Sequence, residues 1–184
     1  MEKNVIDKFL LKLIKEKAIL RGNFTLSSGK KTDYYFDGRI ITLSPAGAYL
    51  VGKRIFDLIR DMKVDAIGGP TLGADPIVAA VTLISHLEGK PIPAFIVRGE
   101  AKTHGTQKEI EGNLPKGGRV VLVDDALTTG KSLLEAIAAV EKEGCRILKI
   151  IVLLDRQEGG TDLLKQKGYD VSAIFKADNQ GEVS

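Results

Sequence analysis

Hydrophobic residues recur with a helical period in four parts of the chain. In residues 2–20 they stand at Val5, Ile6, Phe9, Leu10, Leu13 and Ile14, a spacing typical of an amphipathic helix. The same period returns in residues 48–59, where Ser44 as N-cap and Pro45 in the first turn mark a helix start. It occurs again in residues 77–87 and 133–140. We therefore predict four helices.

Short runs rich in valine and isoleucine lie between the helical stretches. There are five of them, at residues 64–69, 92–98, 119–125, 147–156 and 171–175. Runs that are apolar on both faces and alternate with helices are typical of a parallel sheet covered on both sides. The pattern predicts an α/β fold with a doubly wound, mainly parallel five-stranded sheet flanked by helices.

Two segments do not follow this alternation. "FTLSSGKKTDYYFDGR", residues 24–39, mixes alternating and aromatic residues and predicts a small antiparallel hood. Residues 99–118 are polar and glycine-rich between two apolar runs, and so long a loop in a compact domain is usually functional or disordered. We predict a single domain over residues 1–184, with hood elements at about 1–40 and a mobile catalytic loop at about 99–113.

Composition narrows the classes of function. The chain has 184 residues, 43% hydrophobic and 28% charged, which is ordinary for a globular protein. A net charge of +3, with both signs mixed along the chain, gives no reason to expect nucleic-acid binding. The lone Cys145 cannot form an internal disulfide, and no apolar run approaches the roughly 18 residues of a membrane span. We expect a cytoplasmic protein that binds neither nucleic acid nor membrane.

The stretch "VVLVDDALTTGKS", residues 120–132, carries the clearest chemistry. It ends like a triphosphate-binding loop, but Asp125 stands where that loop needs its first glycine. Ligands of open parallel sheets bind outside the carboxyl ends of the strands. There, residues 128–130 can donate hydrogen bonds to one phosphate at a helix N-terminus, while Asp124 and Asp125 can accept them from sugar hydroxyls. An isolated aspartate would more simply end a strand or cap a helix, but the whole string predicts a ribose 5-phosphate site.

This stretch resembles the phosphoribosyl pyrophosphate (PRPP) signature of type I phosphoribosyltransferases. The resemblance implies that the two acids hold the 2- and 3-hydroxyls of the ribose and that the following loop binds the 5-phosphate. The PRPP-binding residues implied in this turn are Asp124, Asp125, Ala126, Leu127, Thr128, Thr129, Gly130, Lys131 and Ser132.

Further segments are similar to the orotate phosphoribosyltransferases of that family. "RGEAKTHG", residues 98–105, resembles their mobile loop, which implies that Arg98, Lys102 and His104 contact the pyrophosphate part of PRPP. Cations that close over this leaving group would stabilise the charge that develops on it. The resemblance implies Lys102, His104 and Asp125 as catalytic residues.

The base-binding residues are implied by the same resemblance. "LLDRQEGG" contains Arg156, whose planar fork matches a carboxylate, and orotate differs from uracil by its carboxylate. Thr128 and Arg156 are thus implied to bind orotate. "GGPTLGADP", residues 68–76, resembles the pyrophosphate loop of the family, and residues 24–39 resemble the hood that covers the base.

The implied reaction joins orotate and PRPP to give orotidine 5′-monophosphate and pyrophosphate in UMP biosynthesis. Mg²⁺ is the implied cofactor, held mainly by PRPP rather than by protein ligands, and the implied assembly is a homodimer whose loop reaches the neighbouring site. The chain departs from many members at Ser27 and Gly99, where they carry lysine, and at Leu72 and Gly73, where they carry Tyr-Lys.

Two other functions stay open from the sequence. A purine phosphoribosyltransferase would share the PRPP turn but would need no partner for a carboxylate. A nucleotide-sensing regulator that binds nucleic acid would need a basic surface or an added helix-turn-helix module, and the sequence offers neither.

Overall fold

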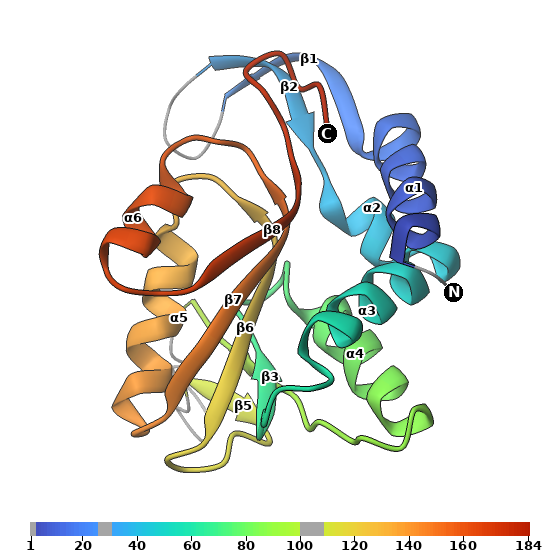
Figure 1. The fold of residues 1–184 in the computed structure, drawn as a ribbon. Coiled ribbons are helices and arrows are strands. Elements are labelled where there is room, and N and C mark those ends of the chain that lie inside the picture. The colour runs from blue at the N-terminus through green and yellow to red at the C-terminus, as the bar shows by residue number, and fades with distance from the viewer. Residues whose placement is uncertain (1–2, 26–30, 100–108) are drawn as a thin grey trace.

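A parallel sheet of four strands forms the centre of the fold (Figure 1). The computed structural model describes residues 3–25, 31–99 and 109–184. The strand order is β3–β6–β7–β8, and each neighbouring pair is parallel. The strands are β3 (Ala66–Gly68), β6 (Arg119–Leu127), β7 (Arg146–Asp155) and β8 (Val171–Lys176). The predicted parallel sheet is confirmed, with one change in strand number.

The fifth predicted strand is attached to the sheet only loosely. β4 (Phe95–Val97) lies beside β3 through two isolated parallel bridges, Ile67 with Ala94 and Pro70 with Val97. Its continuous partner is β5 (Ile110–Gly112), which pairs with it in the antiparallel sense. Pro93, two residues before β4, has no N–H to donate to a ladder. The expectation of five continuous strands was therefore wrong by one, and residues 110–112 of the predicted loop form a strand.

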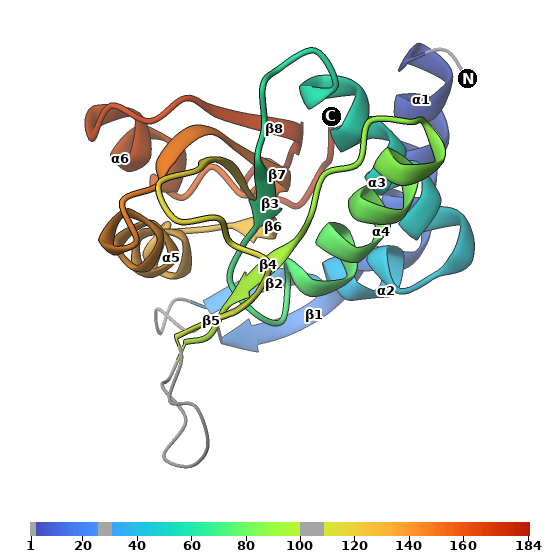
Figure 2. The ribbon, with the colours of Figure 1, turned by 90° about the horizontal axis from the view of Figure 1, so that it is seen from below.

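Helices cover both faces of the sheet (Figure 2). α3 (Pro45–Ile59) and α4 (Asp75–Leu87) lie on one face, and α5 (Lys131–Lys142) and α6 (Gly160–Gln166) lie on the other. Alternate residues of β6 supply the two cores: Val121 and Val123 pack towards α3 and α4, while Val120 and Leu122 pack towards α5. Because successive side chains of a strand point to opposite faces, one apolar run fills both cores, and the doubly wound arrangement is confirmed.

The N-terminal segment differs from the single helix predicted over residues 2–20. α1 (Lys3–Leu13) is followed by a π-helical turn (Ile14–Ala18) and then by β1 (Ile19–Thr25), which pairs antiparallel with β2 (Lys31–Phe36). Pairing of Ile19 with Phe36 overrides the helical period there. Two short helices, α2 (Gly38–Thr42) and α6, also went unpredicted. Among the described helices, none is long and apolar enough to cross a membrane.

The β1–β2 pair lies over the end of the sheet at which β6 finishes, and the C-terminus lies beside it (Figure 1). α1 instead packs into the main core through Ile6 and Leu10, which are fully buried. An ion pair of 2.6 Å between Asp7 Oδ1 and Arg54 Nε ties α1 to α3. The hood over the sheet edge therefore consists of β1 and β2, and α1, which precedes it, belongs to the helical layer of the main core.

An exposed aspartate–arginine pair joins the starts of β3 and β6. Asp65 accepts the backbone N–H of Arg119 at 2.8 Å and the guanidinium Nε and Nη2 at 2.9 Å each. These hydrogen bonds, from the Arg119 side chain first and its backbone second, lower the pKa of Asp65 from 3.8 to about 2. The ionised carboxylate therefore favours the folded state.

We expect Asp65→Asn to lower the urea midpoint of unfolding at pH 7. The folded-state pKa lies below the unfolded one, so this contribution is complete above about pH 4 and is lost as the pH falls towards 2. Urea titrations between pH 6 and pH 2 measure it, with Asp61→Asn as the control, since Asp61 makes one exposed contact of 3.2 Å to Lys90. A difference between wild type and Asp65→Asn that persists unchanged at pH 2 would contradict the assignment.

Candidate active site

Two adjacent carboxylates stand at the carboxyl end of β6. Asp124 is 6% exposed and still belongs to the sheet, in register with Val152 of β7. The backbone N–H of Asp125 donates to Asp124 Oδ1 at 2.9 Å, which fixes the first carboxylate beside the main chain of the second. Asp125 is partly exposed and borders a pocket. The pair therefore lies at the edge where parallel sheets bind ligands.

Two glycines allow the surrounding backbone to approach these acids closely. A Cβ on Gly73, in the loop before α4, would lie 2.4 Å from Oδ1 of both Asp124 and Asp125. A Cβ on Gly38, at the start of α2, would lie 2.7 Å from Asp125 Oδ2. Any side chain at either position would displace the carboxylates. Gly73, where the chain departs from many relatives of the implied family, therefore fits the acid pair by its lack of a side chain.

Burial gives the acid pair an unusual protonation equilibrium. It raises the pKa of Asp124 well above the ordinary value, and the neighbouring charge of Asp125 raises it further. Burial also raises the pKa of Asp125, although hydrogen bonding with Asp124 and the charge of Arg39 act in the opposite direction. Two carboxylates held side by side in this way have a free-energy cost in the absence of a ligand, which is typical of a functional site.

The turn that follows the acids leads into the N-terminus of α5. Gly130 adopts a left-handed conformation with φ of 84° directly before the helix, and no side chain caps it in the part of the chain described. The carbonyl of Thr128 accepts the N–H of Gly160 at 2.9 Å, which anchors the turn to the start of α6. The first N–H groups of this twelve-residue helix are suited to a phosphate.

Arg156 follows β7 and reaches the same edge of the sheet. Its backbone N–H donates to Leu127 O at 2.9 Å, and its side chain is 4% exposed. The guanidinium carbon lies 4.6 Å from the ring centroid of Tyr34. Nε is 3.1 Å from Glu158 Oε1, but its N–H is not directed at that oxygen and has no acceptor among the described residues. The side chain is therefore an ion-paired cation with donor capacity left for a ligand.

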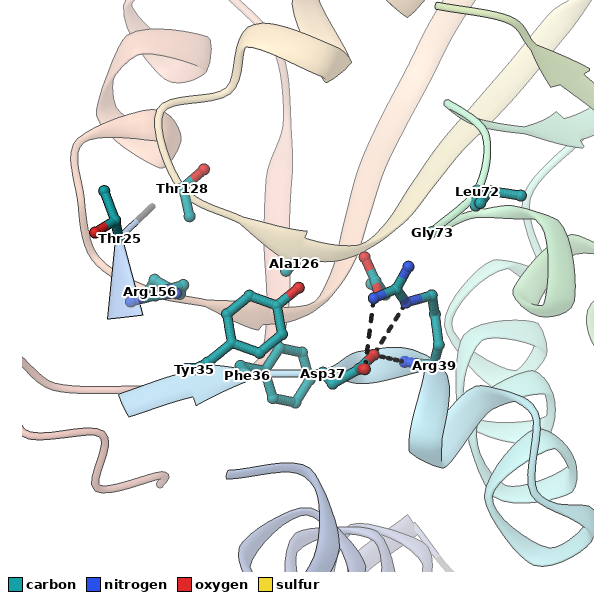
Figure 3. Close-up of a pocket in the computed structure, with 11 residues that line it drawn as sticks. Thr25, Tyr35, Phe36, Asp37, Arg39, Leu72, Gly73, Ala126, Thr128 and Arg156 are labelled. Carbon is teal, nitrogen blue, oxygen red and sulfur yellow. Dashed lines mark hydrogen bonds and ion pairs between the residues drawn. The ribbon is translucent and has the colours of Figure 1, made fainter. Parts of the chain in front are cut away.

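These groups border one pocket of about 410 Å³ (Figure 3). Figure 3 shows Arg156 at one end and Leu72 and Gly73 at the other, with hood residues facing Ala126 and Thr128 across the space. The residues that line it are Thr25, Tyr35, Phe36, Asp37, Arg39, Leu72, Gly73, Asp125, Ala126, Thr128 and Arg156. The pocket thus lies between the hood, the loop before α4, the last residues of β6 with the turn that follows them, and the residue after β7.

The structure places the predicted site residues in three groups. Asp125, Ala126, Thr128 and Arg156 line the pocket itself. The others of the β6–α5 turn lie beside it: Asp124, Leu127 and Gly130 are buried, and Thr129, Lys131 and Ser132 are exposed at the start of α5. Arg98 is half-buried just after β4, whereas Lys102 and His104 lie outside the described residues. For those two, the predicted role stays a prediction.

Sequence reasoning missed a charged pair on the hood side of the pocket. Asp37 and Arg39 both line it, and Asp37 Oδ1 accepts Arg39 Nε at 3.0 Å and caps the N-terminus of α2 by accepting Arg39 N–H at 3.1 Å. The hydrogen bond and charge of Asp37 raise the pKa of Arg39. In the sequence, this pair is visible only as the charged "DGR" that directly follows an aromatic run. No local pattern indicates that it lies near Asp124 and Asp125.

Comparisons with known proteins agree with this geometry. The sequence model of the phosphoribosyl transferase domain family matches residues 40–181 of the chain. The orotate phosphoribosyltransferase of Aquifex aeolicus is 40% identical over 91% of this chain and 93% of its own length, and that of Streptomyces coelicolor is 44% identical over 90% and 91%. A crystal structure of Mycobacterium tuberculosis orotate phosphoribosyltransferase in complex with PRPP is similar, with a TM-score of 0.77, 34% identity and 93% and 96% coverage.

Proposed function

The chain belongs to the orotate phosphoribosyltransferases of the phosphoribosyl transferase domain family, and from this we propose that its pocket joins orotate to the ribose of PRPP. The products are orotidine 5′-monophosphate and pyrophosphate, an early step towards UMP. One observation carries the proposal: a single pocket lies between the acid pair, the phosphate-binding turn and a buried arginine.

The acid pair and the turn between β6 and α5 together bind the ribose 5-phosphate part of PRPP. Asp125 lines the pocket and Asp124 stands directly behind it, so both can accept hydrogen bonds from neighbouring ribose hydroxyls. The residues from Thr128 to Gly130 and the N-terminus of α5 receive the 5-phosphate. Together they hold the pentose by both ends and place its anomeric carbon within the pocket.

The base lies between the hood and the end of β7. Arg156 donates to the carboxylate of orotate, and Thr128, which lines the same end of the pocket, contributes a second polar contact (Figure 3). In the reaction the C1–O bond to pyrophosphate breaks and its electron pair leaves with pyrophosphate. A ring nitrogen of orotate forms the new C1–N bond, and the proton of this nitrogen passes to solvent. Orientation and charge stabilisation suffice for this displacement, and no covalent protein intermediate is needed.

The pyrophosphate side relies on groups at the edge of the described structure. Arg98 stands at the end of β4 with its Nε buried and without an acceptor among the described residues. Lys102 and His104 follow it in the sequence, and we assign all three to pyrophosphate. Their charges would stabilise the leaving group as its bond breaks.

Mg²⁺ is the proposed cofactor, and the donor chemistry fits it. Carboxylate and phosphate oxygens are the ligands that this ion prefers. Asp124 and Asp125 lie at the proposed ribose site, close enough to contact an ion held by PRPP. When bound, the ion neutralises charge on the pyrophosphate of PRPP. We further assign the protein to the cytoplasm and to a homodimer that shares the loop around Lys102; resemblance to the family supports both assignments.

The test is turnover of PRPP with a panel of bases. Release of pyrophosphate is measured with orotate, adenine, hypoxanthine and xanthine, each with Mg²⁺ and with excess chelator. Light scattering at the same protein concentration gives the mass of the active particle. We expect turnover with orotate and Mg²⁺ alone, from a particle of two chains. Turnover with a purine would instead identify the protein as a purine phosphoribosyltransferase. If PRPP binds but no base is turned over, transfer of the phosphoribosyl group is excluded.

A further inference from the structure

Tyr34 is a hood residue that does not face the pocket but contacts Arg156. It stands in β2 next to Tyr35, which does line the pocket, and alternation along the strand turns the two rings to opposite sides. Tyr34 is 2% exposed, and the guanidinium carbon of Arg156 lies 4.6 Å from its ring centroid. This distance and the burial of both groups make a strong cation–π contact.

The chain beyond β8 forms a hairpin that packs on Tyr34. Lys176 and Ser184 exchange backbone hydrogen bonds of 3.0 and 2.9 Å, and Asp178 Oδ1 accepts the N–H groups of Gln180 and Glu182 at 2.9 and 2.8 Å. Val183 is 2% exposed and belongs to the main core. Residues 177–184, which we call the C-terminal hairpin, therefore form an ordered unit with its own turn.

Three polar contacts and one close packing contact join the C-terminal hairpin to the hood. The Tyr34 hydroxyl donates to Asp178 O at 3.2 Å, and Arg21 of β1 pairs with Glu182 at 2.8 Å and donates to Gln180 O. Gly181, with φ of +78°, lies so close to the Tyr34 ring that a Cβ there would be 2.6 Å from its Cγ. Its backbone thus determines where the ring lies.

We infer that Tyr34, held by the C-terminal hairpin, is a positioning residue that orients the Arg156 guanidinium towards the carboxylate of the base. Within residues 3–25, 31–99 and 109–184, Arg156 has one carboxylate partner, Glu158, near Nε, and the ring of Tyr34 limits the side chain on another side. A planar donor must be oriented to bind a carboxylate through two hydrogen bonds. The inference rests on the proposed role of Arg156 in orotate binding.

The first test compares Tyr34→Leu with Tyr34→Phe in steady-state kinetics. Leucine removes the ring, and we expect KM for orotate to rise about tenfold, with KM for PRPP changed less than twofold. Phenylalanine keeps the ring but loses the hydroxyl, with its bond to Asp178 O and its own interaction with the Arg156 side chain. Because the ring carries the positioning, phenylalanine should restore KM for orotate to within about twofold of wild type. Equal increases in both KM values, or no rescue by phenylalanine, would reduce Tyr34 to a packing residue.

A double-mutant cycle separates this inference from the function it rests on. If Tyr34 acts through Arg156, Tyr34→Leu should change KM for orotate less than twofold when Arg156 is already lysine. If Arg156→Lys alone leaves KM for orotate unchanged, the proposed orotate site fails. If Arg156→Lys raises it and the effect of Tyr34→Leu is the same in both backgrounds, only the positioning role fails.

The hairpin is tested by Gly181→Ala against Gly168→Ala. Both glycines have positive φ, +78° and +92°, but a Cβ on Gly181 meets the Tyr34 ring, whereas a Cβ on Gly168 meets nothing within 4 Å. Both changes should lower Tm, and only Gly181→Ala should raise KM for orotate, by about threefold to tenfold. A rise in both variants, or in neither, would remove the hairpin from the positioning of Arg156.

Discussion

Asp125→Asn is expected to remove most of the activity and to raise the stability of the ligand-free protein. The carboxylate accepts a ribose hydroxyl in the proposed complex, and a hydrogen bond to a charged group contributes about 1.5–3 kcal/mol. At about 1.4 kcal/mol for each factor of ten, kcat/KM for PRPP should fall about 10- to 150-fold. Asparagine keeps the shape, so the loss would report the charge rather than the packing.

The gain in stability follows from the raised pKa values of the pair. Burial first, then mutual repulsion, raises the pKa of Asp124, and burial raises that of Asp125. Since the folded-state pKa lies above the unfolded one, the charge destabilises the fold at neutral pH and this cost disappears as the pH falls. Replacing one charge should add about 1 kcal/mol to the free energy of unfolding, or about 2–4 °C in Tm.

Asp65→Asn is the matched control for this prediction. It makes the same change to a carboxylate whose pKa is lowered by Arg119, away from the pocket. It should therefore lower stability at pH 7 and leave kcat/KM unchanged, the opposite of Asp125→Asn in both respects. Calorimetric unfolding without ligand and steady-state kinetics measure the two effects. A lower Tm for Asp125→Asn would mean that the acid pair stabilises the fold and is not a cost kept for the ligand.

Arg156→Lys is expected to raise KM for orotate about 100-fold while PRPP binding in the absence of orotate stays the same. Lysine keeps the positive charge beside Glu158 but loses the planar pair of donors. Loss of a bidentate, charge-assisted contact in a site with 4% exposure corresponds to about 3 kcal/mol. The remaining ammonium can satisfy only part of the base carboxylate.

Arg119→Lys provides the control for this substitution. Arg119 also makes a two-pronged contact with a carboxylate, through Nε and Nη2 to Asp65 at 2.9 Å each, but it does not line the pocket. Kinetics with orotate as the varied substrate and calorimetry with PRPP alone measure the two affinities. If Arg156→Lys weakens PRPP and orotate equally, Arg156 organises the whole pocket and does not read the base.

Local patterns predicted most of the central fold. The apolar runs became the strands β3, β4, β6, β7 and β8, and the helical periods became α1, α3, α4 and α5. Burial of an apolar face requires a regular spacing of apolar residues, which can be recognised locally. Prediction failed where strand pairing outweighed a local preference. Ile19 lies in β1 and pairs with Phe36 instead of continuing the N-terminal helix. β4 pairs continuously with β5 instead of with the central sheet. Such choices depend on residues far along the chain.

The sequence by itself determined that Asp124 and Asp125 lie near the carboxyl end of a buried strand, that a turn and a helix follow, and that Arg156 comes directly after the next strand. These facts are local in the chain, and parallel strands bring their carboxyl ends to one edge. The strand β6 continues two residues beyond the acids, to Leu127, which the apolar run did not indicate. Only the tertiary structure decided which backbone lies against the acids, namely Gly38 and Gly73, and that Tyr34 connects Arg156 to the C-terminal hairpin. Tyr34 and Asp178 are 144 positions apart, and no local spacing encodes a contact between segments that meet only when the whole core has packed.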